Sequence, residues 1–288
     1  MIEILLDELP NFNNHISDLI LSSKSERSFR SAQDIDREFN IESWGTLLTA
    51  VEKSKPSSIG KIDDLYCAPD EELVVSIKDK LYLTNQKHAY AKFIEMVSKN
   101  LLSLNGKSEH FVEMGCGYGS KIFNLMQLPD FKQKTFSATE LTENGRRLTS
   151  LISQLLGNEI PVGHVNFDTR VADVDSVPEN SVIFTSYALH YANNLDVDFW
   201  DFIASFKPKA VVAFEPCFEL YETKSVLGLM RQKYHQENRY TENIASSFRE
   251  FCNINKKHLR ILPNVFGLNP LLPVSILIYE EGQSSELK

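Results

Sequence analysis

Residues 110–120, with the sequence HFVEMGCGYGS, constrain the fold more than any other stretch of the chain. A short apolar run ends at an acidic residue, and a turn containing Gly115, Gly117 and Gly119 follows. Apolar residues then recur at helical spacing over residues 122–126. The pattern predicts a buried strand, a glycine loop that lets backbone approach a ligand closely, and a helix. In α/β proteins, nucleotides bind at this kind of junction.

The spacing of the glycines distinguishes between cofactors. A dinucleotide-binding loop reads G-x-G-x-x-G, whereas here Glu113 is followed by glycines at 115, 117 and 119. This spacing disfavours a dehydrogenase and resembles the first motif of the class I S-adenosylmethionine-dependent methyltransferases. The resemblance implies that Glu113 binds the amino group of the cofactor. It also implies that the loop, including Cys116, passes beneath the sugar and the methionine portion.

Later segments match the same family in order. Glu140 ends the next apolar segment, 21 residues after Gly119 (140 − 119), where a Rossmann-type acid binds the ribose hydroxyls. Phe167 and Asp168 follow the third expected strand and are expected to contact the adenine, and Ser186 ends the fourth. The resemblance therefore assigns cofactor binding to Glu113, Gly115, Cys116, Gly117, Gly119, Glu140, Phe167, Asp168 and Ser186.

The resemblance also implies an α/β fold. We expect a Rossmann-like, seven-stranded, mainly parallel sheet in the order 3-2-1-4-5-7-6, with helices on both faces. Residues 85–288 form the methyltransferase domain in this interpretation, with a lid-like insertion around 220–251, and residues 1–84 form a mostly helical cap. An apolar stripe over residues 85–104 predicts a helix that leads into the first strand.

Candidate catalytic residues follow from the reaction that the family carries out. Methyl transfer is an in-line displacement, so the enzyme aligns the acceptor and removes its proton. Tyr187 and His190 follow the fourth strand, where the family places its acceptor, and Glu215 ends the fifth. The alternative for His190 and Tyr187 is a structural role in a turn, which is common for single histidines.

Two further groups have a functional and a structural interpretation. Glu215, Glu219 and Glu222 either hold a cationic amine or complement the dipole of a helix that starts near Pro216. Arg231 and Tyr234 belong either to a substrate-selecting lid or to an amphipathic helix with a solvated face.

Composition narrows the substrate and the compartment. The chain has 39 acidic and 30 basic residues and a formal net charge of −9, which disfavours a nucleic-acid partner. Its four cysteines form no C-x-x-C pair, so we expect neither a metal site nor a disulfide framework, and a cytoplasmic location fits. We expect no membrane span, and a homodimer remains open.

The leading functional prediction is S-adenosylmethionine-dependent N-methylation of a small polar, amino-acid-like amine or guanidine. Small-molecule O-methylation, nucleic-acid methylation and noncatalytic cofactor binding are the alternatives.

Overall fold

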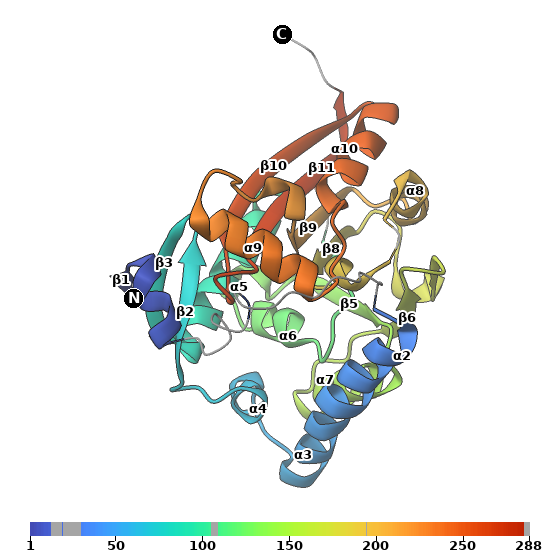
Figure 1. Ribbon diagram of the computed structural model, residues 1–288. Helices are drawn as coiled ribbons and strands as arrows, with labels where there is room; N and C mark the ends of the chain where they lie inside the picture. Colours follow the sequence, from blue (N-terminus) through green and yellow to red (C-terminus); the bar gives the residue numbers. More distant parts are fainter. Residues whose placement is uncertain (13–18, 20–29, 105–108, 194, 285–288) are drawn as a thin grey trace.

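The computed structural model (Figure 1) describes residues 1–12, 19, 30–104, 109–193 and 195–284. Its centre is an eight-stranded sheet with the order β10-β11-β9-β8-β4-β5-β6-β7. The strands are β4 (His110–Met114), β5 (Thr135–Glu140), β6 (Val162–Asn166), β7 (Val171–Ala172), β8 (Val182–Ser186), β9 (Ala210–Pro216), β10 (Lys257–Phe266) and β11 (Val274–Ser284). Strands β6, β5, β4, β8 and β9 are parallel, and β11 is antiparallel to β9 and β10. The expected α/β sheet and its strand order are confirmed.

The sheet has eight strands rather than seven because the chain reverses directly after β6. Asn166 Oδ1 accepts hydrogen bonds from the backbone N–H groups of Asp168 and Thr169, both at 3.0 Å. Such a side-chain turn brings the chain back on itself, and β7 then pairs antiparallel with β6. Two-residue β7 lacks the alternating pattern by which a strand is detected in a sequence.

The two faces of the sheet are covered by different helices because successive strand residues point to opposite sides. Phe111 and Val212 face the cluster covered by helices α5 (Gln86–Leu102) and α6 (Ser120–Met126). Their neighbours Val112 and Val211 face the cluster of α8 (Val197–Ser205) and α10 (Ile244–Ile254). Helices α7 (Glu143–Leu155) and α9 (Val226–Glu237) and the 3-10 turns η3 (Pro129–Phe131), η4 (Val174–Ser176), η5 (Leu189–Tyr191) and η6 (Phe218–Leu220) complete this part of the chain.

The segment before residue 85 contains helices together with a small sheet that the sequence analysis did not predict. Its helices are α2 (Ala32–Ile35), the π-helix η2 (Asp36–Gly45), α3 (Thr46–Ser54) and α4 (Ile59–Tyr66), preceded by the 3-10 helix η1 (Leu6–Asn11). Strands β1 (Ile2–Ile4), β2 (Glu72–Ile77) and β3 (Lys80–Asn85) form an antiparallel sheet in the order β1-β3-β2. Residues 13–18 and 20–29 of the expected cap lie outside the described residues.

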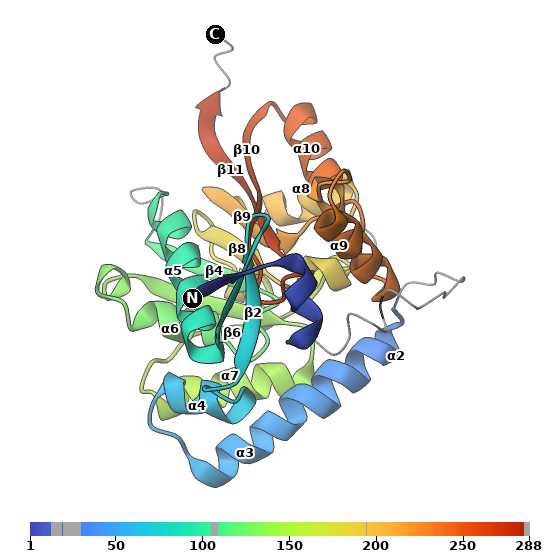
Figure 2. The ribbon, with the colours of Figure 1, turned by 60° about the vertical axis from the view of Figure 1, so that its left-hand side comes forward.

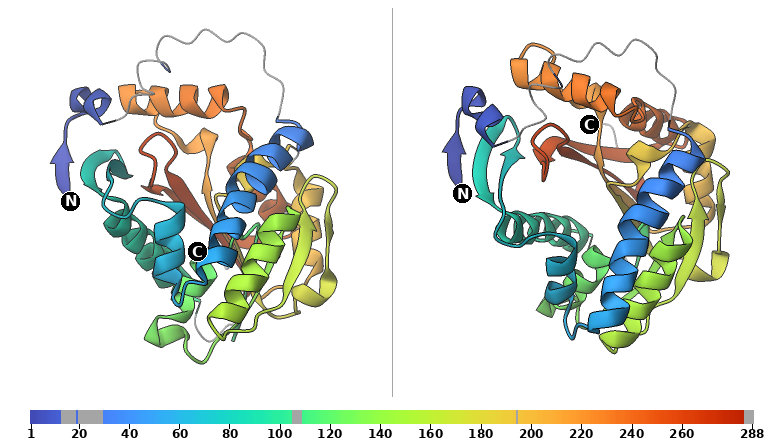
Figure 3. Two further views of the ribbon diagram at one scale, coloured as in Figure 1. Left: turned by 90° about the horizontal axis from the view of Figure 1, so that it is seen from below. Right: turned by 60° about the horizontal axis from the view of Figure 1, so that its bottom comes forward.

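Helices α2, η2 and α3 run side by side with α7 along one edge of the main sheet (Figures 2 and 3). Asn144 of α7 donates two 2.8 Å hydrogen bonds to Asn40 of η2, from its backbone N–H to Oδ1 and from Nδ2 to the backbone carbonyl. Burial of Trp44, Leu48 and Val51 against Leu148 and other α7 residues fixes the same contact. The N-terminal helices are thereby held beside the carboxyl ends of β5 and β6.

The expected lid-like insertion contains two helices with different positions. Leu227 of α9 packs on Val74 and Leu81 of the small sheet, so α9 joins that sheet to the rest of the molecule. Helix α10 lies on the main sheet, where Phe248 and Phe251 are buried. None of the described helices has the length and apolar character needed to span a bilayer.

Candidate active site

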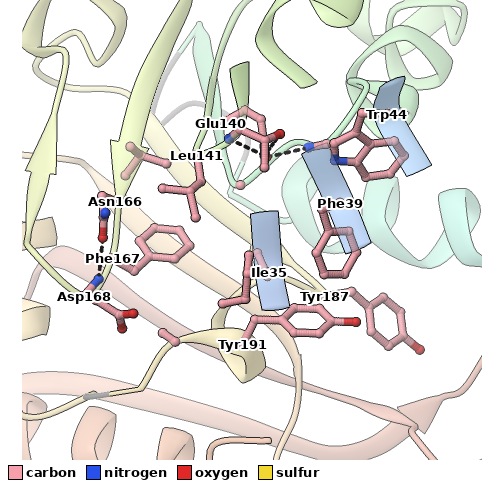
Figure 4. A pocket seen from close by; sticks show the side chains of 16 residues that line it. Ile35, Phe39, Trp44, Glu140, Leu141, Asn166, Phe167, Asp168, Tyr187 and Tyr191 are labelled. Atoms are coloured by element: carbon pink, nitrogen blue, oxygen red, sulfur yellow. Dashed lines mark hydrogen bonds between the residues drawn. The ribbon is translucent and has the colours of Figure 1, made fainter. Parts of the chain in front are cut away.

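Two connected cavities lie at the carboxyl ends of the parallel strands. The first, the β5–β6 cavity, has a volume of about 110 Å³ and is lined by Glu140, Leu141 and Phe167 on one side. Side chains of the N-terminal helices, from Ile35, Phe39 and Trp44, line its other side (Figure 4). The second, the α4–α5 cavity, has a volume of about 790 Å³. Residues shared by both linings show where they meet: Phe39, Trp44, Gly115, Gly117, Tyr187 and Tyr191.

The glycine loop forms the floor between the cavities and requires glycine at two positions. Gly115 has a φ of +75°, and a Cβ atom there would lie 2.6 Å from the Ala188 Cβ. Gly117 has a φ of +61°, and its Cβ would lie 2.8 Å from Trp44 Cζ2. Other residues disfavour positive φ, and no side chain fits these contacts. Gly119, with a φ of +76°, immediately precedes α6.

Cys116 lies between Gly115 and Gly117 in the same loop, and its side chain is buried. Its Sγ atom lies 3.7 Å from Thr149 Oγ1, and burial raises the pKa of its thiol well above the usual range. The thiol therefore stays protonated, and Cys116 contributes to packing at the edge of the α4–α5 cavity.

Glu140 ends β5 and is oriented by three hydrogen bonds. Its Oε2 atom accepts from the Gly117 N–H at 3.0 Å, and Oε1 accepts from the Thr142 N–H at 3.0 Å and hydroxyl at 2.8 Å. Carboxylate oxygens retain further acceptor capacity. The structure thus places the two carboxylate oxygens of Glu140, which can accept further hydrogen bonds, at the wall of the β5–β6 cavity. The sequence analysis assigned Glu140 to ribose binding.

Phe167 and Asp168 line the far end of this cavity. Phe167 packs edge-on against Phe199, with ring centroids 5.7 Å apart. The Asp168 carboxylate accepts from Asn193, at 2.7 Å from the backbone N–H and 2.9 Å from Nδ2. An apolar ring and a fixed polar group therefore line the same space.

Glu113 lies beneath the glycine loop and outside the lining of both cavities. It is 0% exposed, and Lys121 Nζ lies 3.1 Å from its Oε1. This contact is an ion pair without hydrogen-bond alignment, and neither oxygen has a hydrogen-bond partner among the described residues. Burial raises the pKa of Glu113 to about 7, against the opposing effect of Lys121. Burial also disfavours the charged form of Lys121, but Glu113 outweighs it and raises the pKa of Lys121.

The segment after β8 brings Ser186, Tyr187 and His190 to the lining of the α4–α5 cavity. Ser186 Oγ is buried without a hydrogen-bond partner in the described part of the chain. Tyr187 has a φ of +52°, and its hydroxyl donates to the Leu272 carbonyl at 3.1 Å. Non-glycine residues with positive φ are uncommon, and strain of this kind is concentrated at functional sites.

His190 and Glu215 form a buried pair. Nδ1 of His190 lies 3.4 Å from Glu215 Oε2, and both Glu215 oxygens accept from the Ala188 N–H at 3.1 Å. Burial lowers the pKa of His190, and Glu215 opposes that shift. A neutral imidazole that donates from Nδ1 to the carboxylate keeps Nε2 as a proton acceptor. Glu215 therefore holds His190 and the turn after β8.

The structure does not bring the three glutamates together in a cavity. Glu219 accepts from the backbone N–H and hydroxyl of Ser246, both at 2.9 Å, and Glu222 accepts from the Lys224 N–H at 2.9 Å. Glu215 is buried against His190 and Ala188. Because all three have these partners and none lines either cavity, the acidic wall is not part of the proposed function.

Arg231 and Tyr234 of α9 also lie outside both linings. The buried Arg231 guanidinium donates to the carbonyls of Pro270 and Lys78 at 3.1 and 2.8 Å, and to Asp79 at 3.0 Å. Arg231 thus ties α9 to the β2–β3 turn. Tyr234 packs against the cluster formed by Leu227 and the small sheet. These contacts favour the structural interpretation of both residues.

Sequence reasoning missed the residues that the N-terminal segment contributes. Phe39 and Trp44 line both cavities, and Asp63 and Tyr66 line the α4–α5 cavity. The apolar spacing around Trp44 predicts a helix, but no spacing rule gives the position of that helix on the sheet. Among the described residues, no group of three or more metal-ligating side chains lies close enough to hold a metal ion.

Comparisons with known proteins agree with this architecture. The solved structure of magnesium protoporphyrin IX methyltransferase from Synechocystis PCC 6803 with bound SAM matches with a TM-score of 0.52 at 9% sequence identity, covering 89% of this chain and 99% of that one. Geranyl diphosphate methyltransferase in complex with GPP and sinefungin matches with a TM-score of 0.48 at 11% identity, covering 83% and 99%. A putative sarcosine dimethylglycine methyltransferase from Galdieria sulphuraria matches with 0.44 at 14% identity, covering 61% and 65%.

No protein-family model matches the sequence, and a search of curated proteins finds no match. At the identities above, structural likeness establishes the fold alone. The chain has the class I methyltransferase fold, with one additional edge strand.

Proposed function

We propose that the protein is an S-adenosylmethionine-dependent methyltransferase that acts on a small molecule. The observation that carries the proposal is the orientation of Glu140. Hydrogen bonds from Gly117 and Thr142 hold its carboxylate at the wall of a cavity that begins at the glycine loop and ends at Phe167. This arrangement suits a nucleoside whose ribose binds Glu140 and whose adenine lies against Phe167 beside Asp168.

The rest of the cofactor extends over the glycine loop in this proposal. Gly115 and Gly117 line both cavities, and Ser186 offers a buried hydroxyl with no other partner in the described residues. The cofactor supplies the methyl group on a sulfonium. The protein's part is to align the acceptor in the α4–α5 cavity and to take up its proton.

His190 is the proposed base, and Glu215 is the residue that positions it. The acceptor in this proposal is a small polar metabolite that is methylated on an amine or guanidine nitrogen. The acidic net charge of −9 supports a small molecule over a nucleic acid. The attacking nitrogen must be neutral, so a buried neutral imidazole suits the removal of its proton. The same base favours hydroxyl methylation as the second candidate, since an oxygen acceptor must also lose a proton.

Cofactor binding tests the proposal directly. Calorimetry with S-adenosylhomocysteine should give measurable binding to the wild type. Glu140→Ala should weaken it about tenfold or more, because a hydrogen bond to a charged group contributes roughly 1.5–3 kcal/mol. Glu143→Ala, on the exposed first turn of α7, is the matched control and should bind as the wild type does. Unchanged affinity in Glu140→Ala would refute the ribose assignment.

Turnover tests the acceptor chemistry. The wild type would be supplied with S-adenosylmethionine and a panel of small amines, guanidines and phenols, and S-adenosylhomocysteine release would be measured. With a working acceptor, His190→Ala should lower kcat by about 10²–10⁴-fold with little change in cofactor affinity. Exposed His88 provides the control His88→Ala. Activity confined to phenols would reject nitrogen methylation in favour of oxygen methylation.

A further inference from the structure

Asp63 is a partly buried carboxylate that the N-terminal segment places in the α4–α5 cavity. Its Oδ1 atom accepts from the Tyr118 hydroxyl at 2.9 Å and from Ser120 Oγ at 2.7 Å. Its Oδ2 atom accepts from Asn124 Nδ2 at 2.9 Å. These donors belong to the end of the glycine loop and to α6, so Asp63 faces the region through which the methionine portion of the cofactor passes.

All three donors are neutral, and none of the described residues forms an ion pair with Asp63. Lys121 is paired with Glu113 instead, and Lys61 Nζ contacts Ser57 Oγ. Burial raises the pKa of Asp63, although its three hydrogen bonds oppose the shift. A carboxylate removed from water is normally balanced by a cation. The described protein residues supply its hydrogen bonds but not that charge.

The surroundings of Asp63 favour an organic cation. The rings of Trp44, Tyr66 and Tyr118 line the same cavity, with their centroids 5.3–5.5 Å from one another. Aromatic faces attract ammonium groups, and the attraction strengthens when water is excluded. An ammonium at Asp63 would therefore have a carboxylate and an aromatic cluster as neighbours.

The sequence analysis expected Glu113 to bind the amino group of the cofactor, but Glu113 does not face either cavity. Glu113 is 0% exposed, is paired with Lys121 and lies outside both cavity linings. We propose that Asp63 of α4, rather than Glu113, binds a primary ammonium group in this cleft, and that this group is the α-ammonium of the cofactor. The inference rests on the proposed function. An ammonium group on the methyl acceptor is the other source of the same chemistry.

A pair of ligands separates the ammonium site from the nucleoside site. S-adenosylhomocysteine carries the α-ammonium, whereas 5′-methylthioadenosine has the same nucleoside and thioether without the amino-acid portion. Asp63→Asn should weaken S-adenosylhomocysteine binding about tenfold or more and leave methylthioadenosine binding unchanged. Asp70→Asn is the matched control, because Asp70 is exposed and lies outside both cavity linings; it should leave both affinities unchanged.

Each other outcome has a defined meaning. A phenethylammonium probe, titrated in the presence of S-adenosylhomocysteine, tests the acceptor as the source. If Asp63→Asn removes binding of this probe alone, the ammonium site stands and the acceptor fills it. If the substitution changes the affinity of none of the three ligands, the inference is overturned.

Failure of the proposed function would look different. In that case the wild type binds neither S-adenosylhomocysteine nor methylthioadenosine, and the phenethylammonium titration still decides whether Asp63 binds an ammonium. Thermal unfolding with and without ligand checks the fold of each variant. Asp63→Ala replaces Asp63→Asn if the asparagine variant does not fold.

Discussion

The β5–β6 cavity takes its polar wall from the ends of neighbouring strands, whereas the α4–α5 cavity takes its walls from segments far apart in the chain. Glu140 ends β5 and Phe167 follows β6, and these strands are consecutive in the main sheet's parallel part and adjacent in it. Asp63 instead contacts Tyr118, Ser120 and Asn124 across 55–61 residues. The polar wall of the first cavity is a consequence of the parallel sheet itself, since strand ends meet at one edge, although Ile35, Phe39 and Trp44 close its other side. The second depends on how the N-terminal segment docks.

The charged groups of the cleft follow the same division. Glu140 faces the first cavity and is held by neutral donors, which keeps its carboxylate ready for a ligand. Glu113 and Glu215 are 0% exposed, and each is turned toward a protein partner, Lys121 and His190 respectively. The comparison indicates that buried pairs hold the framework between the cavities, whereas Glu140 and Asp63 line the cavities, where we propose that they bind ligands.

The Glu113–Lys121 pair gives the largest expected effect. Glu113→Gln leaves the Lys121 side chain, which is only 16% exposed, without a countercharge and should destabilise the protein by about 3–5 kcal/mol. Lys121→Met should cost less, because the remaining carboxyl group can stay protonated at neutral pH: its pKa is already raised to about 7 by burial, with Lys121 present. Urea unfolding of both single variants and the double variant measures the coupling. Additive losses would show that the two residues do not stabilise each other.

His235 of α9 gives a pH-dependent effect on the stability of the fold. Its Nε2 lies 2.7 Å from the Thr241 carbonyl, its Nδ1 lies 3.3 Å from the Tyr221 hydroxyl, and burial lowers its pKa to about 4. In the unfolded chain, His235 binds a proton near pH 6.5. In the folded protein, it binds this proton only near pH 4. The contribution of His235 to the free energy of unfolding is therefore fully present above the pKa of the unfolded chain. As the pH falls from about 6.5 to 4, the free energy of unfolding decreases by about 3 kcal/mol.

His235→Gln should flatten the stability profile in this window, as measured by urea unfolding from pH 7.5 to 4. His88→Gln, at an exposed position of α5, should keep the wild-type slope. Equal slopes for His235→Gln and the wild type would contradict the assignment. His190 is also buried with a lowered pKa and contributes in the same direction, so the slope should decrease rather than vanish.

Much of the sheet could be predicted because each main strand is an apolar run that ends at a glycine, polar or acidic position. Glu140 was predicted from its position 21 residues after Gly119, and the structure places it on the wall of the β5–β6 cavity. Strand β7 was missed because it depends on a turn at Asn166 rather than on an apolar run. Asp63 and Trp44 were missed because their contacts arise only when the N-terminal helices dock. Arg231 could not be assigned from its spacing, since its partners lie in the β2–β3 turn and near Pro270.

Gly117→Ala tests whether the N-terminal segment closes on the glycine loop as tightly as the structure shows. The new methyl group would lie 2.8 Å from Trp44 Cζ2 at a φ of +61°, and a strained position of this kind costs about 1–3 kcal/mol. S-adenosylhomocysteine binding should also weaken, because Trp44 lines both cavities. Gly60→Ala is the matched control: it lies in α4 with no atom within 4 Å of the added carbon. That change should stabilise the protein by roughly 0.5–1 kcal/mol.

Asn40→Ala should give the smallest effect and bears directly on the docking of the N-terminal helices. It removes the side-chain acceptor for the Asn144 N–H, together with an exposed hydrogen bond from Asn40 Nδ2 to Asp36, and leaves the bond from Asn144 Nδ2 to the residue 40 carbonyl. One such bond contributes about 0.5–1.5 kcal/mol, so stability should fall by that amount. S-adenosylhomocysteine affinity should fall a few-fold, since Phe39 and Trp44 sit on the same helix and line the cavities. Glu42→Gln, on the exposed side of this helix, should change neither quantity. If Asn40→Ala lowers stability but not affinity, the N-terminal wall keeps its position without this bond, and the packing of Trp44 and Val51 on α7 is sufficient to hold it.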